Sequence, residues 1–542
     1  MSAPSQDLGR IMLERHQRLV LNNLRTGPDL VLPAPATGRD EKGGEAPPRR
    51  RLRRPRKPVP MSRDPRYVEQ VLAPRYAFAC REELRYLLQI LAAHTLMLRR
   101  QDLITPQSAA AILGALAEIG SEELPAYDPR YEDLYFVIEQ RVAAAAVGAG
   151  DFRLALSRND TWAALARLML RDQVLALIAG LDDLRGAVLD QAERHRDTLI
   201  MAHTHHQHAQ PTTAAHYLIA AAAAIERCVE RYRQAVDRLD RSPMGAAALT
   251  TTGFPIDRAY TAALLGFCGV LENSYDAVSA ADHVGEVAGC HAVLATTLSR
   301  IVQDLLLWAS TEVGGLELAP GFIQISSIMP QKRNPVALEH VRSELSRLLG
   351  VCAAVHASAH NVPFGDVNDP VDDLLPPLTD AHRGLAGAIA LFSELLASAR
   401  IVPGAWAEAL RGTFATSTEL ADTLVREAGL RFNDAHAVVT RLVEDRRRRG
   451  LDFSGLSPGE VDAAARATIA RSVRLSQETI ARAIDPRCFV ARRAVCGGPA
   501  AQPVAAMLAG ACASLAASRQ MARGRQERIA AAHEERARAA EE

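Results

Sequence analysis

The sequence has few aromatic residues and no excess of charge of either sign. Phe, Trp and Tyr make up 5% of its 542 residues, hydrophobic residues make up 48%, and alanine is abundant. This composition favours closely packed helices over an aromatic-rich β-sandwich. Lys plus Arg and Asp plus Glu both number 63. The balance therefore gives no reason to expect nucleic acid or an anionic membrane as the main partner.

Cysteine pairs and long uncharged apolar runs are also missing. The eight cysteines are scattered without a Cys-x-x-Cys pair, which indicates buried free thiols in a reducing compartment. No uncharged apolar run reaches about 18 residues, the usual length of a membrane-spanning helix, and no signal-type apolar core begins the chain. We expect a soluble, cytoplasmic protein.

Apolar residues recur at helical spacing through most of the chain, and almost no segment alternates as a strand does. Val174, Leu177, Leu181, Leu184 and Val188 repeat in alternating threes and fours, which predicts a seam of a helical bundle. The fold class predicted is all-α. The expected divisions are a disordered basic arm (1–61), an N-terminal helical domain (62–156), a central bundle (157–404), a small helical domain (405–502) and an Ala/Arg-rich helical tail with a frayed charged end (503–542).

The basic arm contains a dense run of positive charge, Arg49 to Lys57. A solvated, disordered segment and a contact for polyanions are both open readings of such a run. Because the chain as a whole is neutral, the solvated segment is favoured.

Two polar blocks interrupt the helical pattern in the first half of the chain. Ser157-Arg158-Asn159-Asp160 immediately precedes a long helix, where polar residues either cap the helix or hold an anion. The segment 203–208 contains four histidines. No Cys or carboxylate joins them locally and no pair has i, i+4 spacing, so acid–base work is favoured over a metal site.

A third block lies between two long apolar helical patterns. Ser326-Ser327-Ile328-Met329-Pro330-Gln331-Lys332-Arg333-Asn334-Pro335 is followed by Glu339. Two prolines bracket its polar positions, so we expect a loop with rigid edges. A polar loop held between buried helices is a common way to build a reactive site.

These blocks, in this order, resemble the fumarase/aspartase superfamily, and within it argininosuccinate lyase. Phe254-Pro255-Ile256-Asp257-Arg258 and Asn273-Ser274-Tyr275-Asp276-Ala277-Val278-Ser279 match as well, and coverage is about residues 65–515. The resemblance implies a three-domain subunit and a homotetramer with a core of 20 helices. Each active site would be shared by three subunits and would need neither metal nor cofactor. The implied reaction is reversible β-elimination of fumarate and an amine from a small dicarboxylate substrate.

The resemblance also implies roles for individual residues. Ser326 would be the base at carbon, while Lys332 and Asn334 would bind the carboxylate on which negative charge accumulates. His205, paired with Glu339, would act on the nitrogen side. The remaining predicted substrate-binding residues are Ser157, Arg158, Asn159, Thr204, Gln207, Ser327, Met329 and Asp366. For Arg158 a structural salt bridge is an equally good reading, and Ser327 and Glu339 have structural readings too.

Departures from argininosuccinate lyase gather at one end of the expected site. Arg153-Leu154-Ala155-Leu156 replaces the family's His-Thr-small-Arg, Ile325 replaces a glycine, and Ala281 falls where an arginine is expected. The family's guanidinium-side Tyr, Gln and Lys fall at Asp366, Val371 and Leu374. Asp366, Asp369, Asp372 and Asp373 would suit a cationic amine, or simply an acidic helix N-terminus.

We therefore predict a carbon–nitrogen lyase that releases fumarate and an amine other than arginine. It could be nearer to lyases of aminopolycarboxylates or to biosynthetic relatives. Argininosuccinate lyase proper and a structural homologue without catalysis are the alternatives.

Overall fold

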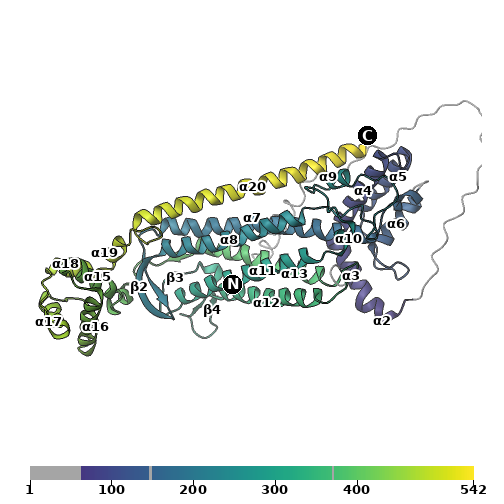
Figure 1. Cartoon of the computed structure of the whole chain (residues 1–542). Coiled ribbons are helices and arrows are strands. Elements are labelled where there is room, and N and C mark those ends of the chain that lie inside the picture. Colours follow the sequence, from purple (N-terminus) through teal and green to yellow (C-terminus); the bar gives the residue numbers. More distant parts are fainter. Residues whose placement is uncertain (1–62, 146–148, 369–371, 542) are drawn as a thin grey trace, which may run out of the picture.

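The computed structural model describes residues 63–145, 149–368 and 372–541, and in these ranges helices dominate (Figure 1). The all-α prediction is therefore confirmed. The predicted basic arm lies outside the described residues.

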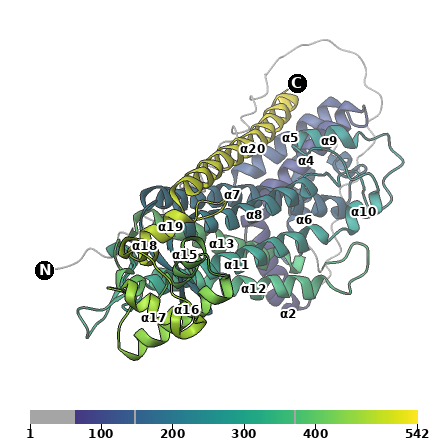
Figure 2. The ribbon, with the colours of Figure 1, turned by 60° about the vertical axis from the view of Figure 1, so that its left-hand side comes forward.

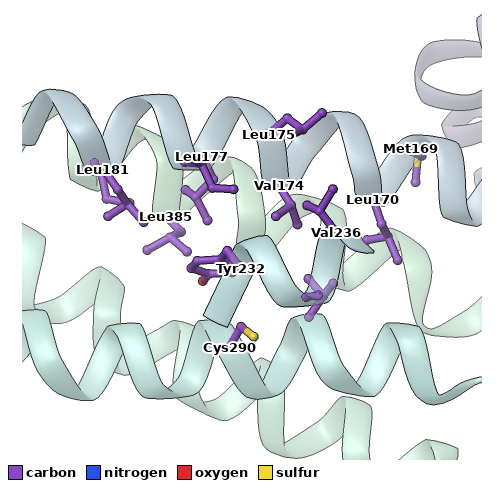
Figure 3. Packing of buried hydrophobic residues seen from close by; sticks show 14 of the residues in the cluster. Met169, Leu170, Val174, Leu175, Leu177, Leu181, Tyr232, Val236, Cys290 and Leu385 are labelled. Atoms are coloured by element: carbon purple, nitrogen blue, oxygen red, sulfur yellow. The ribbon is translucent and has the colours of Figure 1, made fainter. Parts of the chain in front are cut away.

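Five long helices run side by side and form the bundle at the centre of the molecule (Figure 1). Their bounds are α7 (Arg158–Arg194), α8 (Ala214–Leu239), α11 (Asp282–Trp308), α12 (Val336–Ala359) and α13 (Leu375–Ser398). In Figure 3, Val174, Leu177 and Leu181 of α7 lie in the packed interior with Tyr232 of α8 and Leu385 of α13. The predicted seam is thus a real packing surface. With 37 residues, α7 is about 55 Å long at about 1.5 Å per residue.

Shorter helices flank the bundle at each end. Those on the N-terminal side are α2 (Pro65–Tyr67), α3 (Ala73–Phe78), α4 (Leu84–Arg100), α5 (Pro106–Ser121) and α6 (Leu134–Ala145), with π-helical turns at Val68–Leu72 and Ala79–Glu83. Near the same end lie α9 (Arg258–Leu264) and α10 (Ser274–Ser279). Beyond the opposite end come α14 (Ala407–Gly412), α15 (Ser417–Ala428), α16 (Phe432–Arg448), α17 (Pro458–Ile469), α18 (Gln477–Ile484) and α19 (Pro486–Arg492).

The helices α15 to α18 enclose an apolar cluster of their own. Leu420, Leu424, Val438, Leu456 and Ile480 are buried in it, and it is separate from the large cluster that fills the bundle and its N-terminal neighbours.

Three short antiparallel ribbons occur among the described residues. The longest pairs β1 (Leu199–Thr204) with β2 (Gln207–Thr213). The others pair β3 (Leu316–Glu317) with β6 (Arg400–Ile401), and β4 (Gln324–Ile325) with β5 (Arg333–Asn334). The sequence analysis missed the β1–β2 ribbon, whose histidines and glutamines lack the apolar alternation of a typical strand.

The last helix, α20 (Ala501–Glu541), runs back along the outside of the bundle and packs on α7, α8, α4 and α9 (Figures 1 and 2). The expectation of a frayed charged end is wrong. Arg536 is buried and donates to the carbonyl of Leu264 at 2.8 Å. Arg528 pairs with the buried Asp240, which also accepts from the buried Arg171 at 3.1 Å. Buried charges of this kind are stable only when paired, so these contacts fix the carboxyl half of α20.

In the part of the chain that the structure describes, α20 also contains an 18-residue window of mean hydropathy 1.3. By length and composition alone this one helix could cross a bilayer. Its contacts in the structure are with the bundle.

All eight cysteines are free thiols. Cys228, Cys290 and Cys352 are buried as expected, whereas Cys268, Cys496 and Cys512 are exposed. Burial was therefore predicted correctly only for the thiols inside the bundle.

A chain of buried polar groups crosses the middle of the bundle. The hydroxyl of Tyr232 lies 2.7 Å from Nδ1 of His291, whose Nε2 lies 3.2 Å from Nδ1 of His382. Burial lowers the pKa of His382 to about 4 and lowers that of His291 well below its usual value. Both rings are therefore neutral near pH 7, so each has one N–H and one unprotonated nitrogen, and hydrogen bonds link the three side chains in a row.

Candidate active site

The serine-rich loop is closed by a short β-ribbon. Gln324 pairs with Asn334 and Ile325 with Arg333, so residues 326–332 form the loop at its tip. The Oγ atom of Ser326 accepts hydrogen bonds from the backbone N–H groups of Ile328 (3.3 Å) and Met329 (3.0 Å). Two N–H donors on one oxygen stabilise negative charge there. The position of Ser326 thus suits a hydroxyl that must lose its proton.

Most of this loop faces solvent within a single chain. Ile325 and Ile328 are 71% and 83% exposed, and Ser327, Met329 and Lys332 are also exposed. In one subunit the loop is therefore open to water. The two isoleucines give the loop an exposed apolar surface.

Ile325 was the departure with the least obvious consequence. Its backbone is extended, in strand register with Arg333, and its φ is not in the left-handed region. The position does not need the conformational freedom of glycine, so the substitution leaves the loop's backbone unstrained.

Thr204, His205 and Gln207 lie at the tip of the β1–β2 ribbon. Thr204 pairs with Gln207, and the two residues between them, His205 and His206, have φ of 52° and 60°. Left-handed conformations at both central residues define a type I′ turn, which usually carries Asn or Gly. Two histidines there are a strained choice, and strain of this kind is common at functional positions.

The tip of the ribbon is exposed, and no hydrogen bond or ion pair within the described chain joins His205 to Glu339. Glu339 lies in the first turn of α12 and is exposed as well. The predicted His–Glu pair is therefore not formed inside one subunit.

Ser157, Arg158 and Asn159 stand at the N-terminus of α7. The Oγ of Ser157 accepts from the backbone N–H of Asn159 and donates to the Oδ1 of Asn159 at 2.7 Å, while Asp160 completes a capping box. Arg158 forms ion pairs with Asp133 at 2.7 Å and Glu132 at 3.3 Å. Both structural readings, capping for Ser157 and a salt bridge for Arg158, are thus present in the single chain.

Asp160 is a residue of this block to which the sequence analysis assigned no role. It is fully buried, and its Oδ2 accepts from the N–H groups of Gly245 and Ala247, both at 2.9 Å. Burial raises its pKa to about 6, although the backbone donors act in the opposite direction. One carboxylate therefore ties the loop after α8 to the start of α7.

That loop has an unusual backbone. Gly245, Ala247, Leu249 and Thr251 have positive φ (80°, 48°, 75° and 59°), whereas the residues between them do not. Alternation of this kind turns successive N–H groups towards one concavity, a nest for an anion, which Asp160 occupies. At Gly245 a Cβ would lie 2.6 Å from the Cγ of Arg258, so only glycine fits.

Asp366 lies at the same end of the bundle as the Ser157 block. Partial burial raises its pKa, the neighbouring Asp372 adds to this effect, and Arg158 opposes it. Asp372 itself forms an ion pair with Arg75 at 2.9 Å and is not free to meet an amine, contrary to the prediction for it. Asp369 and Val371 lie outside the described residues.

The predicted site residues therefore fall into two groups at opposite ends of the bundle. One end carries Ser157, Arg158, Asn159 and Asp366; the other carries the β1–β2 tip, the loop 326–332 and Glu339 (Figure 1). Ser157 and the β1–β2 ribbon lie beyond opposite ends of α7, which is about 55 Å long, and Glu339 and Asp366 lie at opposite ends of α12, which is about 36 Å long. A single chain cannot bring all these side chains to one substrate.

Two further features concern ligands. Among the described residues, no three His, Cys, Asp or Glu side chains lie where they could share a metal ion. A cavity of about 740 Å³ lies between the end of α7 and the helices α14, α18 and α19, and none of the predicted site residues lines it.

The chain matches two family descriptions of lyases. The family description "Lyase" matches residues 136–350, and "Argininosuccinate lyase C-terminal" matches residues 414–491. Argininosuccinate lyase 2 of Agrobacterium fabrum is 37% identical over 459 residues, which are 81% of this chain and 88% of that protein. The chain belongs to the argininosuccinate lyase family of the fumarase/aspartase superfamily.

Solved structures agree with this assignment. An EDDS lyase in complex with formate is 31% identical, with a TM-score of 0.80, and the match covers 88% of this chain and 95% of that one. A variant of EDDS lyase with bound fumarate is 30% identical, with a TM-score of 0.79 over the same shares. The chain is thus a fumarate-forming carbon–nitrogen lyase, and the predicted family and enzyme class are confirmed.

Proposed function

We propose that the chain eliminates fumarate from an N-substituted aspartate and releases an amine other than arginine. One observation carries this proposal: the fumarate end of the site has the family's residues, whereas the amine end does not. The loop with Ser326, Lys332 and Asn334 has the residues that the reaction needs, whereas the family's Tyr, Gln and Lys for the guanidinium are Asp366, Val371 and Leu374. A relative of similar identity is named for EDDS rather than for argininosuccinate.

The chemical step follows from the loop. Ser326 removes the proton from the carbon next to the carboxylate, with its two backbone donors stabilising the alkoxide. Lys332 and Asn334 meet the negative charge that develops on that carboxylate. The carbon–nitrogen bond then breaks, the carbon–carbon double bond forms, and the amine leaves with the electron pair. His205, supported by Glu339, supplies the proton on the nitrogen side.

The remaining predicted residues bind the substrate. Ser157, Asn159 and Thr204 donate hydrogen bonds to its carboxylates, with Gln207, Ser327 and Met329 around them. Arg158 is a second cation, and Asp366 faces the amine half. These assignments are part of the proposal.

The active unit is proposed to be a homotetramer with shared sites. In it, the Ser157 end of one subunit meets the His205 turn and the Ser326 loop of two others. The two separated groups of site residues support this, and so does the exposure of Ile325 and Ile328. The free cysteines suit the reducing cytoplasm, where we place the enzyme.

A substrate comparison tests the choice of amine. We expect argininosuccinate to be cleaved at least about 100-fold more slowly than the preferred substrate, because buried polar groups of a ligand left unpaired cost this much or more. Fumarate release would be followed at steady state for argininosuccinate and for a set of N-substituted aspartates. Cleavage of argininosuccinate as the best substrate would establish argininosuccinate lyase proper. No fumarate from any of them, in a folded tetramer, would favour a structural homologue without catalysis.

Mixed oligomers test the sharing of sites. Ser326→Ala and Asn159→Ala each alter one end of the bundle, so each homo-oligomer should be inactive. When the two variants are refolded together, some sites combine Ser326 of an Asn159→Ala chain with Asn159 of a Ser326→Ala chain. These sites contain both residues, so activity should reappear. If the mixture stays as inactive as its components, with mixed oligomers shown by mass spectrometry, the shared site is refuted.

A further inference from the structure

An exposed pair of aromatic rings lies at the end of the bundle that we assign to the amine. Tyr275 opens α10 and Phe364 follows α12; their ring centroids are 6.0 Å apart and the planes meet at 28°. The side chains remain 45% and 66% exposed. The two nearly parallel rings therefore form an apolar patch that the described chain covers only in part. Surfaces of this kind commonly mark binding sites.

The tyrosine half of this pair is held firmly. The side chain of Asn273 caps α10 by accepting from the N–H groups of Tyr275 and Asp276. Ser274 donates to the carbonyl of Leu249 at 2.7 Å, in the strained loop that Asp160 anchors. Gly365 passes close to the ring, since a Cβ there would lie 4.0 Å from the Tyr275 hydroxyl. The ring pair is therefore connected through this loop to the start of α7.

Charge beside the rings has one predominant sign. Asp366 follows Phe364 by two residues and is exposed. Arg158, the cation that lowers the pKa of Asp366, is already paired with Asp133 and Glu132. Asp372 is paired with Arg75. An aromatic surface next to a carboxylate suits a planar group that also carries a positive charge, through stacking, cation–π attraction and an ion pair.

We propose that Tyr275, Phe364 and Asp366 select the amine co-product, which is an amine that carries an aromatic ring and a second, cationic group. This inference rests on the proposed function, because it concerns the same site. Tyr275 and Phe364 stack on the aromatic ring, and Asp366 pairs with the cation. The segment after α12, which differs from argininosuccinate lyase, would thus bind the amine.

The reverse reaction tests this directly, since it needs only fumarate and simple amines. In this addition reaction, the amine nitrogen forms a bond to one alkene carbon of fumarate and a proton is transferred to the other. The amines are para-xylylenediamine, benzylamine, hexamethylenediamine and hexylamine, which vary the ring and the second charge independently. We expect para-xylylenediamine to be the best and hexylamine the poorest.

The variants separate the two contributions. Phe364→Ala should lower kcat/KM for the two aromatic amines on the order of tenfold and leave the aliphatic ones little changed. Asp366→Asn should instead lower kcat/KM for the two diamines and leave that for the two monoamines little changed. Phe432→Ala is the matched control, because Phe432 is also an exposed aromatic residue, 58% exposed, but lies in α16.

The outcomes distinguish this inference from the proposed function. If amines add to fumarate but aromatic ones have no advantage, or Phe364→Ala affects all four equally, the inference is overturned while the lyase remains. If Phe364→Ala dissociates the oligomer on size-exclusion chromatography, the rings form an interface and the inference is overturned. If no amine adds and no N-substituted aspartate is cleaved, the proposed function itself fails.

Discussion

Replacing Ser326 by alanine should lower the rate of elimination by about a thousandfold or more, while the fold and the oligomer persist. The carbon acid is weak, and loss of a positioned base costs about 10² to 10⁴ in rate. Ser326 makes its hydrogen bonds within its own loop, where its Oγ accepts from Ile328 and Met329. Its removal should therefore alter only local structure.

The measurement is the rate of fumarate formation from the best substrate found, together with size-exclusion chromatography and circular dichroism. A loss in kcat with little change in KM would show that the hydroxyl acts in the transition state. Ser121→Ala is a suitable control, because Ser121 is exposed at the end of α5 and donates only to the carbonyl of Glu118. Turnover of Ser326→Ala near that of the control would refute the role of Ser326.

Stability should fall steeply as the pH is lowered from about 6.5 to about 4. Burial lowers the pKa of four histidines to about 4, and of His291 well below its usual value; the four are His94, His283, His382 and His533. Above pH 6.5 these rings are neutral in both the folded and the unfolded chain, so the histidines do not lower the free energy of unfolding. Between 6.5 and 4 the unfolded chain binds protons that the folded chain refuses, and below 4 the loss is complete.

The loss of stability caused by these histidines exceeds the opposite effect of the buried carboxyl groups. Each histidine contributes on the order of 3 kcal/mol, from about 1.4 kcal/mol per pH unit, against a typical total of about 5–15 kcal/mol. Asp160 and Glu83 act in the opposite sense, since burial raises the pKa of each to about 6. Their contribution is greatest at low pH and is lost as the pH rises to about 6. Two carboxyl groups do not offset five imidazoles.

Urea unfolding at a series of pH values measures this dependence. In His94→Gln, the side-chain amide can still donate to the carbonyl of Leu154, which lies 2.9 Å from Nε2 of His94. The variant should keep about 2 kcal/mol at pH 5 that the parent loses. His360→Gln, at an exposed histidine, is the control. Equal stability of the parent at pH 7 and pH 5 would contradict the prediction.

The helices of the bundle could be predicted because each carries a local signal. The seam was expected from the alternating spacing of Val174 to Val188, and these residues do lie in the packed interior along α7. The β1–β2 ribbon could not, since its turn is formed by His205 and His206 rather than by the usual Asn or Gly. Strand pairing here depends on the turn and on packing against neighbouring helices, which a short polar segment does not reveal.

Candidate site residues could be proposed from the sequence, whereas their arrangement could not. Ser326 and Lys332 stand out by type and spacing. By contrast, the pairing of Asp372 with Arg75 joins residues 297 apart in sequence. The buried Arg536 of α20 likewise bonds to a residue 272 positions away. Only the folded chain shows which charges are paired with one another and which remain for a ligand.

The length of α7 has a consequence for how this enzyme tolerates change. If each active site takes residues from both ends of the bundle, the length of the bundle fixes the distance between neighbouring active sites. One residue inserted in α7 would lengthen it by about 1.5 Å and rotate one end by about 100° relative to the other. The antiparallel neighbours and α20, which spans the same distance outside, would have to change with it. We therefore expect natural variation in length to be confined to the loops and to the helices beyond the bundle.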